Sequence, residues 1–258
     1  MLPRSSRCSC TSTAAGSASA ASTIPTSTRA ASAWLPSSRP SLSPLATALR
    51  PNRLPAAHDD ARTLVSWLRA RAAAAPDTWL GEQADFGRVF FAGDSAGGNI
   101  AHHVAVALGS GLLGVTPARV AGYVLLWPFF AGVERTRSEA ESPPGPFVTL
   151  PVYDQFCRLS LPAGATRDHP ALNPFGPESP ALDALALPPV LVVVGEHDLL
   201  RDRAAGYVAR LEAMGKPVEL VEFQGQHHGF LLVDPWGDAG GELIRVVRRF
   251  VYGGASRN

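Results

Sequence analysis

A short segment rich in small residues, Gly93-Asp94-Ser95-Ala96-Gly97, places a serine where it could act as a nucleophile. The residues before it, Arg88–Ala92, predict a short buried strand, and Ala96–Leu108 after it predict a helix. A G-x-S-x-G segment between a strand and a helix is typical of a sharp turn that lifts the serine hydroxyl above a sheet. We therefore expect Ser95 to be a nucleophile, whereas an ordinary helix N-cap serine is the alternative reading of the same motif.

The residues that flank Ser95 are small, as so tight a turn requires. The backbone N–H of Ala96, at the start of the predicted helix, is expected to be one donor to an oxyanion. The remaining residues of the predicted nucleophile elbow are Gly93, Asp94, Gly97 and Gly98.

A serine hydroxyl is a poor nucleophile until a base takes its proton, and two adjacent histidines are candidates for that base. His227 and His228 follow the predicted strand Val218–Phe223. Neighbouring side chains point in different directions, so only one of the two can reach the serine. Four other histidines are interpreted as packing or solvated side chains, the first and last of them in loops: His58, His102, His103 and His169.

An acidic residue that orients the base is expected after the predicted strand Val190–Val194. Asp198 stands just past that strand end, where a carboxylate can reach a histidine on the next loop. Glu196 lies closer to the strand and is the weaker candidate. Asp202 is one helical turn further on and is expected to cap or brace the loop. The order Ser, acid, His along the chain is that of α/β-hydrolases.

The elements that must position these residues alternate between strand and helix, which predicts an α/β fold with a mostly parallel sheet and helices on both faces. Residues 54–73 read as an amphipathic helix, with Ala61, Leu64, Val65 and Leu68 at helical spacing. The later elements are predicted as a strand at 120–126, a helix at 201–214 and a closing helix at 242–252.

A Pro-rich insert, residues 129–187, interrupts this alternation and is interpreted as part of a lid above the carboxyl ends of the strands. Its aromatic side chains form either an apolar pocket wall or an ordinary core: Phe129, Phe130, Phe147, Tyr153 and Phe156.

The composition restricts the class of protein. The chain has 258 residues and a formal net charge of +1, which fits one domain and implies no nucleic-acid partner. No apolar run is long enough to span a membrane. Three cysteines without regular spacing argue against a disulfide framework and fit a reducing compartment. Cys8 and Cys10 lack a second ligand pair, so no metal site is predicted.

The first 53 residues differ from the rest, and the globular domain is predicted over 54–258. No Asp or Glu occurs before Asp59, and Ser, Ala, Thr, Pro and Arg dominate without a helix or strand period. Such a segment is expected to be disordered, and the first strands of the sheet to be missing. A plastid transit peptide is one reading of it.

Beyond Leu54 the chain resembles plant carboxylesterases of the hormone-sensitive-lipase-like group of α/β-hydrolases, which also includes the gibberellin receptors. The matching stretches are LPAAHDDA (54–61), FGRVFFAGDSAGGNIAHHVA (86–105), DHPALNPFGPESPAL (168–182), PPVLVVVGEHDLLRDRA (188–204) and HHGF (227–230).

The resemblance implies hydrolysis of a small-molecule ester by a Ser-His-Asp triad without a metal or organic cofactor. The His-Gly-Phe run of the group selects His228 as the base. The receptors replace that histidine with an apolar residue, so His228 favours an enzyme over a non-catalytic hormone-binding protein. An inactive product of a damaged gene is a further alternative. The oligomeric state is left open.

The group also has a His-Gly-Gly-Gly loop that completes the oxyanion hole, and the sequence lacks this motif. When the reading frame is moved back by one nucleotide, the codons of 13–16 permit His-Gly-Gly-Gly and those of 47–51 permit Tyr-Arg-Leu-Ala-Pro. We infer that residues 4–51 are the family sequence translated in the wrong frame. The transit-peptide composition would then be an artefact, which favours a cytoplasmic protein.

The transcript sequence tests this inference directly. We expect its first 53 codons, read in the shifted frame, to encode a strand followed by His-Gly-Gly-Gly over codons 13–16. Any other translation of those codons would refute the frame error and leave the segment as a genuine part of the chain.

Overall fold

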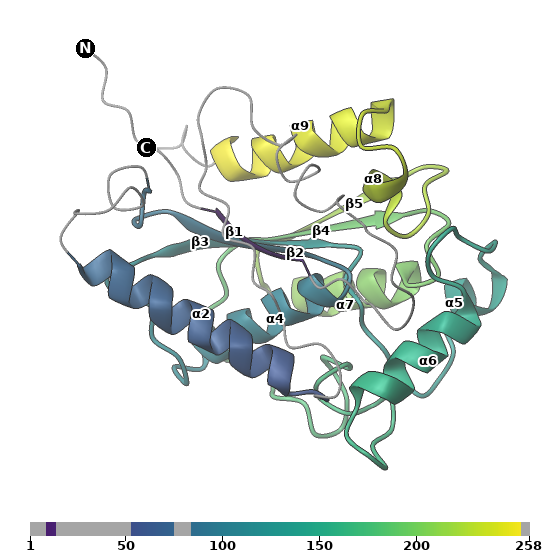
Figure 1. The fold of residues 1–258 in the computed structure, drawn as a ribbon, viewed down its shortest axis with the longest axis horizontal. Coiled ribbons are helices and arrows are strands. Elements are labelled where there is room, and N and C mark those ends of the chain that lie inside the picture. The colour runs from purple at the N-terminus through teal and green to yellow at the C-terminus, as the bar shows by residue number, and fades with distance from the viewer. Residues whose placement is uncertain (1–8, 14–52, 75–83, 254–258) are drawn as a thin grey trace, which may run out of the picture.

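The computed structural model describes residues 9–13, 53–74 and 84–253, and its centre is a five-stranded sheet. The strands follow chain order across the sheet, and each pair of neighbours is parallel (Figure 1). The strands are β1 (Ser9–Thr13), β2 (Val89–Asp94), β3 (Val120–Leu126), β4 (Val190–Gly195) and β5 (Val218–Phe223).

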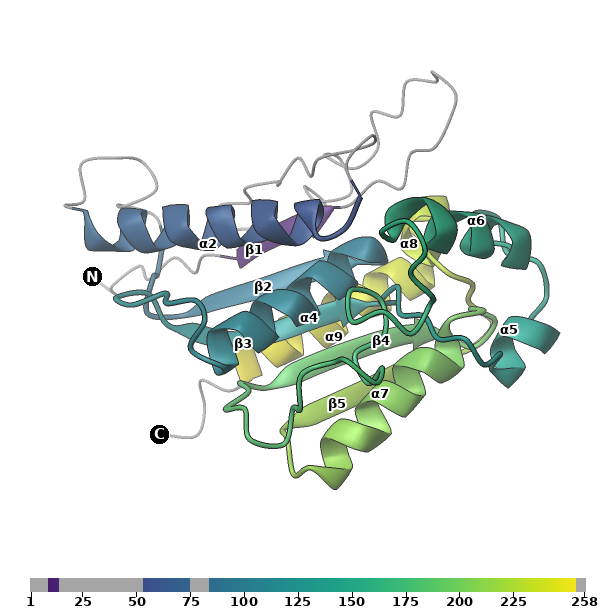
Figure 2. The same cartoon turned by 90° about the horizontal axis from the view of Figure 1, so that it is seen from below.

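Helices cover both faces of this sheet, as the alternating pattern predicted. Helices α2 (Ala56–Ala73), α4 (Ala96–Gly109) and α7 (Arg201–Ala213) lie on one face (Figure 2). The short helix α8 (Phe230–Val233) and the long helix α9 (Asp238–Gly253) lie on the other. The predicted strands and helices after residue 53 are therefore confirmed, with boundaries that differ by a few residues.

Strand β4 lies within the sheet, and each of its residues is buried. Val190, Val192 and Val194 pack into the core beneath α4 and α7. Leu191 and Val193 point to the opposite face and pack against α9. A strand that is covered on both faces buries every side chain, so it shows no polar alternation.

Helix α2 follows its predicted pattern because one stripe of the helix faces the core. Ala61, Val65 and Leu68 are buried, whereas Leu64 is only half-buried at the edge of the stripe. His58 belongs to this buried side of α2, so its placement in a loop was wrong.

Strand β1 was not predicted, and it corrects the expectation that no strand precedes β2. Ser9–Thr13 pairs in parallel with β2, and Thr13 lies opposite Asp94. The edge of β2 presents main-chain N–H and C=O groups, and backbone pairing with them requires no apolar side-chain pattern. Residues 1–8 and 14–52, including Cys8, lie outside the described residues, so the predicted disorder is untested there.

The insert begins after β3 and includes α5 (Arg137–Glu141) and α6 (Leu150–Ser160), which lie beyond the carboxyl ends of the strands (Figures 1 and 2). A separate apolar cluster holds it together, and that cluster includes the buried thiol of Cys157. Burial raises the pKa of this thiol to about 12, so it stays protonated. No helix in the described ranges is long and apolar enough to cross a membrane.

An ion pair attaches the insert to the rest of the domain. Arg203 of α7 lies 2.8 Å from the carboxylate of Glu139, whose side chain is fully buried. Glu139 also closes a capping box with Thr136 at the start of α5. Because an unpaired buried carboxylate is costly, this contact holds α5 against α7.

Candidate active site

Ser95 lies between the last residue of β2 and the first residue of α4, in the sharp turn that the sequence predicted. Its backbone has φ 53° and ψ −116°, a conformation that residues with a side chain rarely adopt. A Cβ on Gly93 would lie 2.2 Å from the carbonyl carbon of Gly97, and one on Gly98 would lie 3.0 Å from Cα of Pro128. The turn can therefore form only because these positions carry no side chain.

His228 follows β5 and brings its ring to the serine. Its Nε2 lies 2.9 Å from Oγ of Ser95, and its Nδ1 lies 2.9 Å from Oδ2 of Asp198. The side chain of His228 is almost completely buried. Gly229 has φ 70°, which turns the chain directly after the histidine and leads into α8.

Asp198 follows β4, and the structure buries its carboxylate completely. While Oδ2 faces His228, Oδ1 accepts a hydrogen bond of 2.8 Å from the N–H of Leu200. Both oxygens thus have partners, and the carboxylate is held with one oxygen directed at the imidazole.

The alternative acidic residues have other contacts. Glu196 accepts a hydrogen bond of 2.8 Å from the N–H of Gly225, which ties the loops after β4 and β5 together. Asp202 accepts one of 2.7 Å from the N–H of Ser138, so it braces α5, as the sequence suggested. Neither hydrogen-bonds to His228 in the described structure.

His227, the other candidate base, makes no hydrogen bond to Ser95 in the described structure, where His228 occupies that position. Its ring lies 5.4 Å from that of His197, and its Nδ1 is buried without a hydrogen-bond partner among the described residues. Of the two adjacent histidines, His228 is therefore the one that the fold brings to Ser95.

Three more histidines lie together on α2 and α4, where His58 and His102 are buried and His103 is partly buried. His58 hydrogen-bonds to Asn99 at 3.0 Å, His102 to the hydroxyl of Tyr207 at 3.1 Å, and His103 to the carbonyl of Ala171 at 3.2 Å. Burial lowers the pKa of each, that of His102 to about 3, so the three rings are neutral at physiological pH. They are packing residues, as predicted for His102 and His103.

Asp94 and Ala96, on either side of the serine, have different environments. Burial raises the pKa of the Asp94 carboxyl, against smaller opposing effects of a backbone hydrogen bond and of His228. Ala96 is the first residue of α4, so its N–H has no carbonyl partner within the helix. Such an N–H is free to bind an anion at the helix N-terminus.

Sequence reasoning missed Asn99, which is 3% exposed and lies one helical turn after Ser95. Its side-chain amide donates to the carbonyls of Phe129, at 3.2 Å, and Ala171, at 3.0 Å. The sequence shows only a lone amide among the small and apolar residues of the predicted helix Ala96–Leu108, and that pattern does not identify its partners.

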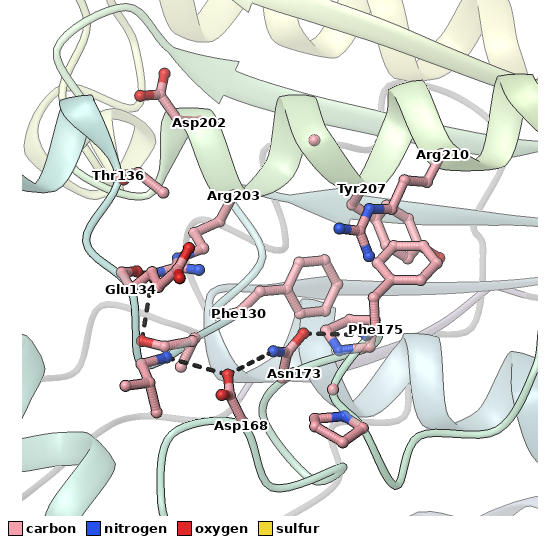
Figure 3. A pocket seen from close by; sticks show the side chains of 17 residues that line it. Phe130, Glu134, Thr136, Asp168, Asn173, Phe175, Asp202, Arg203, Tyr207 and Arg210 are labelled. Carbon is pink, nitrogen blue, oxygen red and sulfur yellow. Dashed lines mark hydrogen bonds between the residues drawn. The ribbon is translucent and has the colours of Figure 1, made fainter.

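A cavity of about 420 Å³ lies between the insert and α7, and Figure 3 shows it from close by. Phe130, Phe175 and Tyr207 form its aromatic part, and Arg203 and Arg210 project toward it from α7. Ser95, Asp198 and His228 are not among the residues that line it.

The insert aromatics therefore serve mainly as core. Of the five that were singled out, Phe130 lines this cavity, whereas Phe129, Tyr153 and Phe156 pack in the apolar cluster of the insert. Phe147 is 47% exposed and lies beside Gly229, next to His228. Phe147 is thus the aromatic residue of the five that lies at the rim of the candidate site.

A parallel sheet covered on both faces, with a serine elbow after β2, an aspartate after β4 and a histidine after β5, defines the α/β-hydrolase class. The chain belongs to the alpha/beta hydrolase fold family, whose model matches residues 50–232, and its relatives come from the plant carboxylesterase and gibberellin-receptor group.

Two relatives represent the two kinds of protein in this group. Gibberellin receptor GID1C of Arabidopsis thaliana is 39% identical over 183 residues, which are 70% of this chain and 50% of the receptor. The 3-O-acetylpapaveroxine carboxylesterase CXE1 of Papaver somniferum is 36% identical over 190 residues, which are 71% of this chain and 59% of that enzyme. The chain spans about half the length of the curated relatives it matches.

Solved structures agree with the fold. The thermostable carboxylesterase EstE1, cloned from a metagenomic library, superimposes with a TM-score of 0.77 at 26% identity, covering 98% of this chain and 82% of that one. This chain therefore shares its fold with a carboxylesterase of known structure.

The glycine at the turn gives a prediction for stability. Gly93→Ala places a methyl group against the backbone at Gly97, so we expect a loss of about 1–3 kcal/mol or more in the free energy of unfolding. Gly206, within α7, has nothing within 4 Å of its Cβ position. Gly206→Ala should therefore raise stability by about 0.5–1 kcal/mol. Urea unfolding measures both, and two changes of the same sign would contradict the steric argument.

Proposed function

We propose that this protein hydrolyses carboxylic esters through an acyl-enzyme formed on Ser95. The observation that carries the proposal is the unbroken hydrogen-bond chain from Ser95 Oγ through His228 to Asp198, with 2.9 Å at both links. A neutral imidazole whose Nδ1–H is directed at a carboxylate has its Nε2 lone pair free to accept the serine proton.

In the proposed reaction, His228 Nε2 takes the proton from Ser95 Oγ as Oγ bonds to the ester carbonyl carbon. Asp198 stabilises the resulting imidazolium. The imidazolium then protonates the leaving alcohol as the carbon–oxygen bond of the ester breaks, which leaves the acyl group on Ser95. A water molecule, deprotonated by His228, attacks the acyl carbon, and the acid leaves as Ser95 regains its proton.

The oxyanion of the tetrahedral intermediate needs backbone donors, and the N–H of Ala96 supplies one of them. The second set belongs to the His-Gly-Gly-Gly loop that we infer was lost by a frame error before residue 52. Loss of one such donor costs a factor of about 100–1000 in turnover. The chain as given is therefore expected to be a much weaker esterase than a version with the restored frame, although its hydrolase domain over 54–258 retains the other groups.

The second candidate function is binding of a small hormone-like molecule without turnover. The observation in its favour is the 38–40% identity to gibberellin receptors. His228 argues against it, because a receptor gains nothing from an imidazole held between a serine and a buried carboxylate. For either function we propose a small-molecule ligand and a cytoplasmic location, with the plastid as the alternative.

The choice of the base can be tested with two adjacent substitutions. His228→Ala should reduce turnover of p-nitrophenyl acetate by at least about a thousandfold, because Ser95 then has no base. His227→Ala should leave most of the turnover, since its ring faces His197. The opposite result would transfer the role of the base to His227.

The whole proposal is tested with two proteins, one as given and one with residues 4–51 replaced by the shifted-frame translation. A fluorophosphonate probe should label Ser95 in the repaired protein, and short-chain esters should be hydrolysed at least about a hundredfold faster than by the chain as given. Labelling at another serine would refute the nucleophile. Equal turnover by the two proteins would refute our account of the first residues, and hormone binding without turnover or labelling would support the receptor.

A further inference from the structure

The carbonyl of Ser95 belongs to a closed ring of hydrogen bonds behind the elbow. It accepts from the N–H of Phe129 at 2.9 Å and from the N–H of Asn99 at 3.2 Å. The carbonyl of Phe129 accepts in turn from the side-chain amide of Asn99 at 3.2 Å. Asn99 thus binds the carbonyl of Phe129, and the N–H of Phe129 binds the carbonyl of Ser95.

The orientation of the Asn99 amide is unambiguous. Two carbonyl oxygens, of Phe129 and Ala171, face its nitrogen, so that nitrogen must be the NH₂ group. Its oxygen therefore accepts from Nε2 of His58, which must carry the ring proton there. His58 lies on α2 and stacks on His103 of α4, with ring centroids 3.8 Å apart. The Asn99 amide, which also lies on α4, is therefore held in part by a residue of α2.

Ser95 needs such support because its own backbone is strained and so is that of the neighbouring segment 126–129. Ser95 and Trp127 both have positive φ, at 53° and 38°. Conformations of this kind persist only where the surroundings over-determine them. The N–H of Ser95 donates to the carbonyl of Leu126 at 2.9 Å, and the carbonyl of Ser95 accepts from the N–H of Phe129. The segment 126–129 therefore binds both main-chain polar groups of Ser95. Asn99 is the side chain that fixes the far end of that segment.

We propose that Asn99 is a positioning residue for the nucleophile, and that His58 orients its amide. Without the two donors of Asn99, the Phe129 peptide is free to turn and the Ser95 carbonyl loses a partner. Oγ then moves relative to Nε2 of His228. The expected loss of turnover rests on the proposed esterase function. The expected faster hydrogen exchange of the Phe129 N–H does not depend on that function.

The test compares Asn99→Asp and His103→Phe in this chain and in the version with residues 4–51 replaced, each against its own parent. Asn99→Asp keeps the shape and the acceptor for His58 but removes both donors. His103→Phe keeps the ring stack and removes only the bond to Ala171, so it controls for lost stability. Hydrolysis of p-nitrophenyl acetate, fluorophosphonate labelling of Ser95 and hydrogen exchange of the peptide containing Phe129 are measured for each protein.

Asn99→Asp should lower kcat and the labelling rate by a factor on the order of 100, because small misplacement of reacting groups has that effect. KM should stay within about twofold of the parent, and exchange at Phe129 should accelerate. His103→Phe should lower the unfolding temperature without these changes. Should Asn99→Asp prove insoluble, His58→Phe, which removes the donor to the Asn99 oxygen, should show a smaller loss of kcat with the same exchange signature.

Unchanged exchange at Phe129 in a folded Asn99→Asp protein would overturn the proposal, as would equal losses of kcat in Asn99→Asp and His103→Phe. A parent protein that neither hydrolyses esters nor labels would contradict the esterase function instead. In that case the exchange comparison alone decides the role of Asn99.

Discussion

The conformation of one residue, Ser95 at φ 53° and ψ −116°, is the constraint on which the site depends. A serine held this way presents its hydroxyl at the end of the sheet, at a conformational cost of about 1–3 kcal/mol. The side-chain-free positions 93 and 98 make the turn sterically possible, and hydrogen bonds from Phe129 and to Leu126 hold it. Asn99 of α4 belongs to the same arrangement, since its side chain holds the segment 126–129 that hydrogen-bonds to Ser95.

The parallel sheet solves the problem of bringing distant residues together. Ser95, Asp198 and His228 each follow a strand, and the carboxyl ends of parallel strands meet along one edge. The strands β3 and β4 between the serine and the histidine are buried on both faces, so the ends of the strands are held by the apolar core. The hydrogen bonds of the segment 126–129 and of Glu196 then fix the loops that carry Ser95 and His228 on this core.

The helices α5 and α6 of the insert lie beyond this edge. The insert's own apolar cluster, together with the buried Glu139–Arg203 pair, attaches it to α7. The cavity beside α7 is separate from the serine, so an apolar and aromatic composition in the insert is not evidence for a substrate pocket. Strand β1 forms one side of the sheet, and its last residue, Thr13, lies opposite Asp94, next to the elbow.

The sequence alone determined the order of strands and helices after residue 53, the turn at Ser95 and the position of Asp198 just after a strand, because these depend on local patterns of apolar, small and charged residues. It could not choose between His227 and His228 from local pattern, since both follow the same strand, and the direction of each ring is set only when β5 is placed beside β4. Tertiary structure also decided the strand at Ser9–Thr13 and the role of Asn99. Both depend on main-chain groups of segments far away in the chain, and such partners leave no periodic signal in the sequence.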